Sequence, residues 1–118
     1  MSALQEIATR QHTVLLTSLT LVEFGSLTRK LRNQGSLTTT ESEAIFEQLL
    51  AVPHSLVPVT TADIAAGYRL AAVLGQSDTF DSTGHAVAQR LHAEFWVSDR
   101  RFAGVAERVA LPGVRLIP

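Results

Sequence analysis

Hydrophobic and polar residues follow two patterns along the chain, one typical of strands and one typical of helices. Four short apolar runs, partly β-branched, are typical of buried strands: Thr13–Thr17, Leu56–Thr60, Glu94–Val97 and Val114–Ile117. Between them, apolar residues recur at the spacing of helices: Ser2–Gln11, Thr20–Asn33, Thr40–Pro53, Thr61–Gly75, Asp81–Leu91 and Phe102–Val109. Strands that alternate with helices in this way predict an α/β fold with a mainly parallel sheet of about four strands.

Length and composition indicate one globular domain over residues 1–118. The chain is 46% hydrophobic and 18% charged, has a formal net charge of -1 and contains no cysteine. We therefore expect a protein without disulfides or thiol chemistry, located in the cytoplasm. No apolar run approaches the ~20 residues of a membrane span, and the first residues lack the apolar region of a signal peptide. Because there is no overall positive charge, any binding of nucleic acid would depend on local basic patches.

Two carboxylates occupy positions where α/β proteins gather ligands. Asp99 directly follows the predicted strand Glu94–Val97, and Asp81 opens the helix before that strand. Ligands of open α/β sheets bind at the carboxyl ends of strands, so the two side chains can converge. Each also has a structural explanation, since both precede helical patterns and can cap them. Glu23 likewise fits the second half of a capping box that starts at Thr20.

The order of these segments resembles the PIN domain family. The stretch FDSTGHAVAQRLHAEFWVSDRRF (Phe80–Phe102) is similar to the carboxyl half of a PIN domain, in which an aromatic–Asp pair opens an Ala-rich helix and a second Asp follows a strand. The stretch LTSLTLVEFGSLTRKL (Leu16–Leu31) resembles the segment that carries an acidic residue on the second helix. The family's first Asp, on an opening strand, has no counterpart in this sequence, and Val97 stands where the family usually has Thr.

The resemblance implies a truncated, three-layer PIN-like domain similar to the toxin ribonucleases of bacterial toxin–antitoxin pairs, with an incomplete Mg²⁺ or Mn²⁺ site. Its catalytic and metal-binding residues would be Glu23, Asp81 and Asp99, with Asp78 as an auxiliary metal ligand. The phosphates of RNA would meet the basic residues Arg29, Lys30, Arg32, Arg100 and Arg101. An antitoxin protein would be a further partner.

Other interpretations remain open at this point. The chain could be a PIN-like domain without catalysis that binds RNA or another protein, or an unrelated α/β domain whose carboxylates are scattered helix caps. The small sheet also predicts exposed apolar surface, and from it we expect a homodimer formed through the first two helices with the Leu19–Leu31 face. We further expect Thr13–Thr17 to pair with Phe95–Ser98, with the other two strands at the edges of the sheet.

Overall fold

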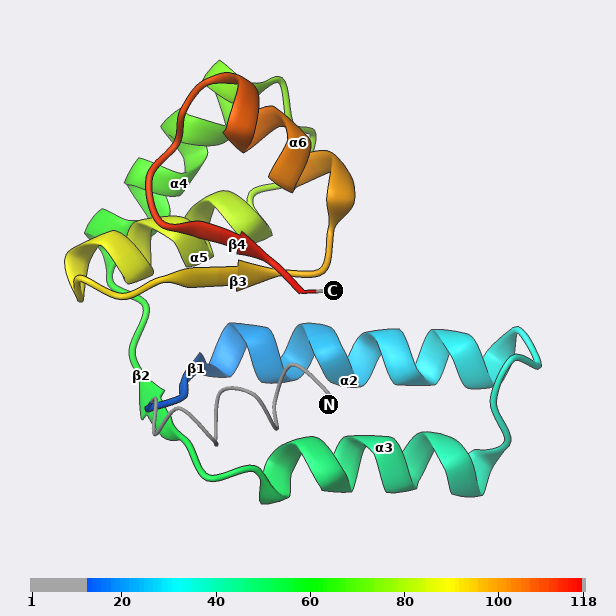
Figure 1. The fold of residues 1–118 in the computed structure, drawn as a ribbon. Coiled ribbons are helices and arrows are strands. Elements are labelled where there is room, and N and C mark those ends of the chain that lie inside the picture. Colours follow the sequence, from blue (N-terminus) through cyan, green and yellow to red (C-terminus); the bar gives the residue numbers. More distant parts are fainter. Residues whose placement is uncertain (1–12, 118) are drawn as a thin grey trace. The chain divides into compact units, whose positions relative to one another are not determined.

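The computed structural model describes residues 13–117, so the expected helix at Ser2–Gln11 lies outside them. The described residues form an amino-terminal unit that ends at Pro58 and a carboxy-terminal unit that begins at Val59 (Figure 1). Both units contain helices and one parallel pair of strands, so the fold is mixed α/β as expected.

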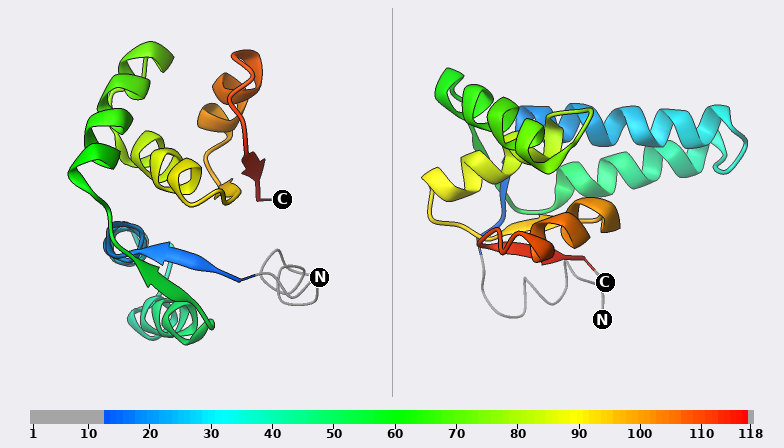
Figure 2. Two further views of the ribbon diagram at one scale, coloured as in Figure 1. Left: turned by 90° about the vertical axis from the view of Figure 1, so that its left-hand side faces the viewer. Right: turned by 90° about the horizontal axis from the view of Figure 1, so that it is seen from above.

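The amino-terminal unit is a helical hairpin attached to two short strands. Its elements are β1 (Leu15–Thr17), α2 (Ser18–Asn33), α3 (Thr39–Ala51) and β2 (Ser55–Val57). Strands β1 and β2 pair in parallel, with Leu16 opposite Leu56. Helices α2 and α3 lie side by side in both views of Figure 2. The Ser42 hydroxyl joins them by donating to the carbonyl of Thr28 at 3.1 Å.

The carboxy-terminal unit consists of two packed helices followed by a β–α–β segment. Its elements are α4 (Thr61–Leu74), α5 (Phe80–Arg90), β3 (Phe95–Val97), α6 (Arg100–Arg108) and β4 (Val114–Leu116). Strands β3 and β4 pair in parallel, with Trp96 opposite Arg115. The core of the unit contains Leu74, Val97, Phe102 and Ala106, which are contributed by α4, β3 and α6.

Close packing and one ion pair hold α4 against α5. A Cβ atom on Gly67 would lie 2.3 Å from the hydroxyl oxygen of Thr83, so only glycine allows this approach. Asp63, which is 4% exposed, accepts hydrogen bonds from Nε and Nη2 of Arg90 at 3.0–3.2 Å. The hydrogen bonds from Arg90 hold the pKa of Asp63 at about 2, below its ordinary value of 3.8. On its other side, α5 meets β3, where a Cβ atom on Gly84 would lie 2.6 Å from the ring of Phe95.

The four expected strands are all present, although each is three residues long. They form two parallel pairs, β1–β2 and β3–β4, and a sheet of four strands is not observed. Pairing of Thr13–Thr17 with Phe95–Ser98 would link one unit to the other and stays a prediction. The interpretation of residues 1–118 as a single domain stays a prediction for the same reason.

Loss of the buried ion pair should destabilise the carboxy-terminal unit in a pH-dependent way. We expect Asp63→Asn to lower the free energy of unfolding by about 1–2 kcal/mol at pH 7, since Arg90 is partly exposed and solvent screens the pair. Because the pKa of Asp63 is depressed in the folded protein, its contribution is complete above about pH 5 and is lost as the pH falls from about 4 to about 2. Urea unfolding at pH 7 and pH 2.5 tests this, with Glu47→Gln on exposed α3 as the control. An equal difference between Asp63→Asn and wild type at both pH values would contradict the assignment.

The close approach at Gly67 should make it intolerant of the smallest side chain. We expect Gly67→Ala to destabilise the protein by about 1–3 kcal/mol, because Thr83 backbone atoms would have to move. Gly104→Ala is the matched control, since a Cβ atom there meets nothing within 4 Å. That substitution should instead stabilise the protein by about 0.5–1 kcal/mol through helix propensity. Chemical denaturation of both variants measures the difference, and equal effects would refute it.

Candidate functional site

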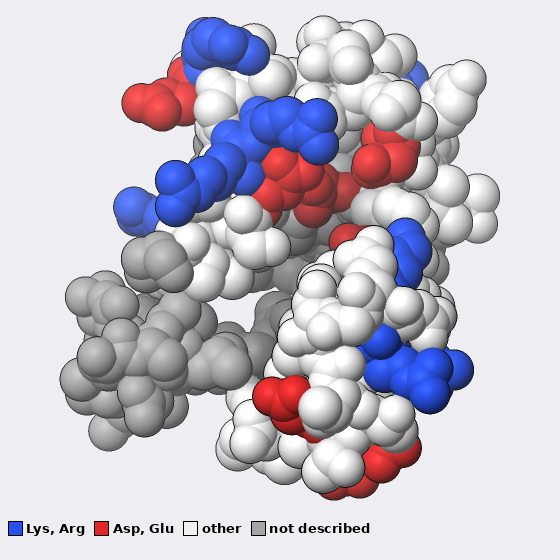
Figure 3. Space-filling model, turned by 90° about the vertical axis from the view of Figure 1, so that its right-hand side faces the viewer, with Lys and Arg blue, Asp and Glu red and all other residues white. Residues whose placement is uncertain are grey.

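Helix α5 and strand β3 run in opposite directions, so the amino end of α5 lies at the same end of the carboxy-terminal unit as the carboxyl end of β3 (Figure 1). Asp81 is in the first turn of α5, and Asp99 follows β3 directly. Asp78 comes two residues before α5, where its Oδ1 accepts a hydrogen bond from the backbone N–H of Phe80 at 3.3 Å. We call these three residues, Asp78, Asp81 and Asp99, the acidic end. Figure 3 looks at this end and shows acidic side chains beside a band of basic ones on the carboxy-terminal unit.

Asp81 is not the N-cap of a helix, so the predicted capping role is wrong for this residue. Helix α5 begins one residue earlier, at Phe80, and its N-cap residue is Thr79, which makes no side-chain capping bond. The half-buried Asp81 sits in the first turn, where a negative charge interacts favourably with the helix dipole. Next to it, the buried hydroxyl of Ser82 has no hydrogen-bond partner among residues 13–117. Such unsatisfied groups cost stability and are uncommon in folded proteins.

Asp99, in contrast, is the N-cap of α6. Its Oδ1 accepts hydrogen bonds from the backbone N–H groups of Arg101 at 2.8 Å and Phe102 at 3.2 Å. The capping explanation is therefore confirmed for this residue. Both bonds use the same carboxylate oxygen, which leaves Oδ2 free of backbone capping bonds and able to contact a ligand.

Glu23 lies on exposed α2 of the amino-terminal unit, so its convergence with Asp81 and Asp99 depends on how the two units associate and stays a prediction. The capping-box interpretation of Thr20 and Glu23 was wrong. Thr17 caps α2 and accepts a hydrogen bond from the N–H of Thr20, so Glu23 is inside the helix. Across residues 13–117, no three His, Asp or Glu side chains are grouped in a way that could hold a metal ion.

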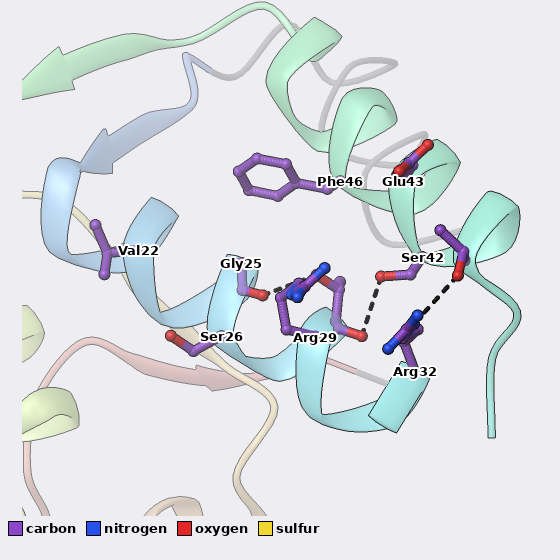
Figure 4. A pocket seen from close by; sticks show the side chains of 10 residues that line it. Val22, Gly25, Ser26, Arg29, Arg32, Ser42, Glu43 and Phe46 are labelled. Atoms are coloured by element: carbon purple, nitrogen blue, oxygen red, sulfur yellow. Dashed lines mark hydrogen bonds between the residues drawn. The ribbon is translucent and has the colours of Figure 1, made fainter. Parts of the chain in front are cut away.

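The predicted basic residues form one group on each unit. Arg100 and Arg101 are exposed in the first turn of α6, where positive charge opposes the helix dipole. The other group, Arg29, Lys30 and Arg32, is exposed near the end of α2. Arg29 and Arg32 line a groove of about 540 Å³ between α2 and α3, together with Glu43 and Phe46 (Figure 4). There Arg32 Nε donates to the hydroxyl of Thr39 at 3.1 Å, which holds one of the two guanidinium groups in place.

Two features of the carboxy-terminal unit were not predicted. The residues of the Asp63–Arg90 pair are 27 positions apart, and no local sequence pattern predicts their contact. Thr60 and Asp63 do have the spacing of the capping box that they form. The hydroxyl of Ser82 is also buried although it adjoins Asp81. His85 of α5 is buried too, and its Nε2 lies 2.9 Å from the carbonyl oxygen of Pro112. Its role there is structural.

Comparison with protein-family models, curated proteins and solved structures returned no match for this chain. None of the helices within residues 13–117 is both long and apolar enough to cross a membrane.

The two roles of Asp99 can be separated by substitution. We expect Asp99→Ala to destabilise the protein by about 1 kcal/mol, because two N–H groups of α6 lose their acceptor. Asp99→Asn should be close to neutral in the absence of metal, since asparagine caps as well as aspartate. Thermal denaturation of both variants measures the two changes in stability. Equal destabilisation by Asn and Ala would show that the charge matters more than the cap.

Proposed function

We propose that this chain is a PIN-like domain of the metal-dependent ribonuclease class, similar to bacterial toxin ribonucleases and with an incomplete site. The observation that carries the proposal is the opposite direction of α5 and β3, because it brings Asp81 and Asp99 to one end of the carboxy-terminal unit. The three-layer arrangement around one sheet of four strands, joined by β1 and β3, belongs to this proposal.

The donor atoms at the acidic end fit Mg²⁺ or Mn²⁺ in kind. Both ions prefer carboxylate oxygens, and Mg²⁺ keeps several waters, so few protein ligands are needed. In the proposed site Asp81 and Oδ2 of Asp99 bind the cation, Glu23 completes the set and Asp78 acts at the rim. A bound cation would polarise a phosphodiester and lower the pKa of a water molecule. The chain offers no counterpart of the family's first Asp, so we expect far slower hydrolysis than a complete site would give.

RNA is the proposed substrate, and the basic residues would hold its phosphates. Arg100 directly follows Asp99, and Arg101 comes next in the first turn of α6. Arg29, Lys30 and Arg32 provide a second basic surface on α2. Contacts of this kind depend on charge and weaken as salt is added. An antitoxin protein is the proposed partner for regulation.

A second candidate function is a PIN-like domain that binds RNA or protein without catalysis. The observation that favours it is the role of Asp99 as a helix cap, together with the absence of a three-residue metal group among residues 13–117. Exposed apolar residues on α2 offer a surface for a protein partner, since Val22 is 67% and Leu27 50% exposed.

Metal binding should raise the thermal stability of the wild-type protein. A ligand that binds only the folded state stabilises it, and Mn²⁺ at about ten times its Kd should raise Tm by roughly 5 °C. Asp81→Asn and Asp99→Asn should abolish this shift because each removes an anionic ligand while keeping side-chain size. Glu47→Gln, on exposed α3, is the matched control and should respond as the wild type does.

The same four proteins are then incubated with a labelled single-stranded RNA and Mn²⁺. Slow cleavage by wild type and the control, but not by the two Asn variants, is the expected result. RNA binding without a metal shift or cleavage would establish the second candidate function. The proposal fails altogether if wild type shows no metal shift, no cleavage and no binding.

A further inference from the structure

Helix α6 and strand β4 border an open groove on the carboxy-terminal unit. It has a volume of about 440 Å³, and no residue of β3 lines it. The helix contributes residues that are three or four positions apart and so share one face: Arg100, Ala103, Gly104 and Glu107. The strand contributes Val114 and Leu116. The groove is therefore basic at one end, acidic at the other and apolar along its floor.

The outer edge of β4 presents backbone groups that have no partner strand within residues 13–117. On its inner side, the carbonyl of Gly113 accepts from the N–H of Phe95 at 2.7 Å, and the N–H of Ile117 donates to the carbonyl of Val97 at 2.8 Å. In a parallel pair, alternate residues point their N–H and C=O groups to opposite sides. The backbone N–H and C=O groups of Val114 and Leu116 therefore point away from β3, and no strand within residues 13–117 pairs with that edge. An open edge of this kind is a template for another strand.

Gly104 is a glycine in the middle of α6 that no contact within the described residues explains. A Cβ atom there would meet nothing within 4 Å, whereas Gly67 and Gly84 are each forced by a close neighbour. Glycine is among the poorest helix-forming residues. Together with Ala103, it leaves the centre of the groove without bulk, so the backbone of a second helix can approach closely.

We propose that a second copy of this chain fills the groove. The two α6 helices would cross antiparallel about a two-fold axis between Ala103 and Gly104. Positions 100 and 107 are equidistant from that point, so Arg100 of each copy meets Glu107 of the other. The charges on this face are thus complementary to themselves, as an isologous interface requires. Within residues 13–117 neither side chain forms an ion pair of its own.

The sheet supports the same symmetry. Antiparallel pairing of the two β4 edges would use the outward N–H and C=O groups of Val114 and Leu116 and create a continuous sheet of four strands. Helix α6 contacts both β3 and β4, so the two α6 axes would lie about two strand spacings apart. That is about 10 Å, which matches the distance between packed helices. The Arg115 side chains of the two copies would come close on the opposite face, where Glu94 offsets each at 3.7 Å.

This surface differs from the Leu19–Leu31 face that the hydrophobic pattern predicts for a homodimer. The two arginines at the start of α6 would then have different roles. Arg100 would pair with the second copy, and Arg101 would remain available to bind phosphate. The inference does not depend on catalysis or metal binding.

Sedimentation velocity of the full chain, without metal or RNA, tests the proposal over a range of concentrations. Wild type should dimerise. Arg100→Glu and Glu107→Arg should each raise the dissociation constant by about tenfold or more, because every dimer gains two like-charge contacts. The double variant Arg100→Glu/Glu107→Arg should restore the wild-type value. Gly104→Leu should prevent association while leaving the monomer folded, since its side chain enters open space.

Two controls carry comparable charge changes on other surfaces. Arg69→Glu is exposed on α4, and Leu27→Glu tests the α2 face. Neither should change dimerisation, and circular dichroism should show that all variants are folded. A monomeric wild type, failure of the double variant to recover, or loss of the dimer in Leu27→Glu but not in Arg100→Glu would each overturn the proposal.

Discussion

The contact between α4 and α5 determines where the candidate site residues of α5 lie in the carboxy-terminal unit. Gly67 lets the two helices approach so closely that a Cβ atom would collide with Thr83, and the pair Asp63–Arg90 fixes the helices along their length. A buried pair of this kind contributes more to the choice of one arrangement than to overall stability, because desolvation offsets much of the attraction. With α5 held on one side by α4, its other side meets Phe95 through Gly84. The position of Asp81 at the end of β3 follows from these two glycines.

At the acidic end, Asp81 and Asp99 have different structural roles. Asp99 uses Oδ1 to start α6, whose Phe102 is completely buried in the core. Removing it therefore affects folding as well as any chemistry. Asp81 is not the N-cap of α5, which already begins at Phe80. Its carboxylate lies in the first turn of α5, where a negative charge interacts favourably with the helix dipole.

The sequence predicted the order of strands and helices, but local signals placed several boundaries incorrectly. Thr20 and Glu23 have the spacing of a capping box, yet Thr17 starts the helix because β1 ends there and the helix continues directly from it. At α3, Thr38 and Glu41 form the capping box, two residues before the predicted start. Threonine is frequent in both stretches, so spacing alone could not select the cap. Contacts distant in sequence, such as Asp63 with Arg90, have no local pattern at all. The predicted pairing of β1 with β3 would depend on the association of the two units, which neither periodicity nor capping determines.

The helical glycines also show what the sequence alone cannot predict. In the sequence, Gly67, Gly84 and Gly104 are alike, since each interrupts a helical pattern where alanine would be more favourable. Contacts within the chain account for Gly67 and Gly84, whose missing side chains make room for Thr83 and Phe95. Gly104 faces a groove instead, and with Ala103 it lies midway between Arg100 and Glu107, which have opposite charges on the same helix. Glycine lowers the stability of α6 here, and no contact within the described residues requires it. A partner outside the chain would explain it, and an antiparallel copy of the same helix would place Arg100 opposite Glu107.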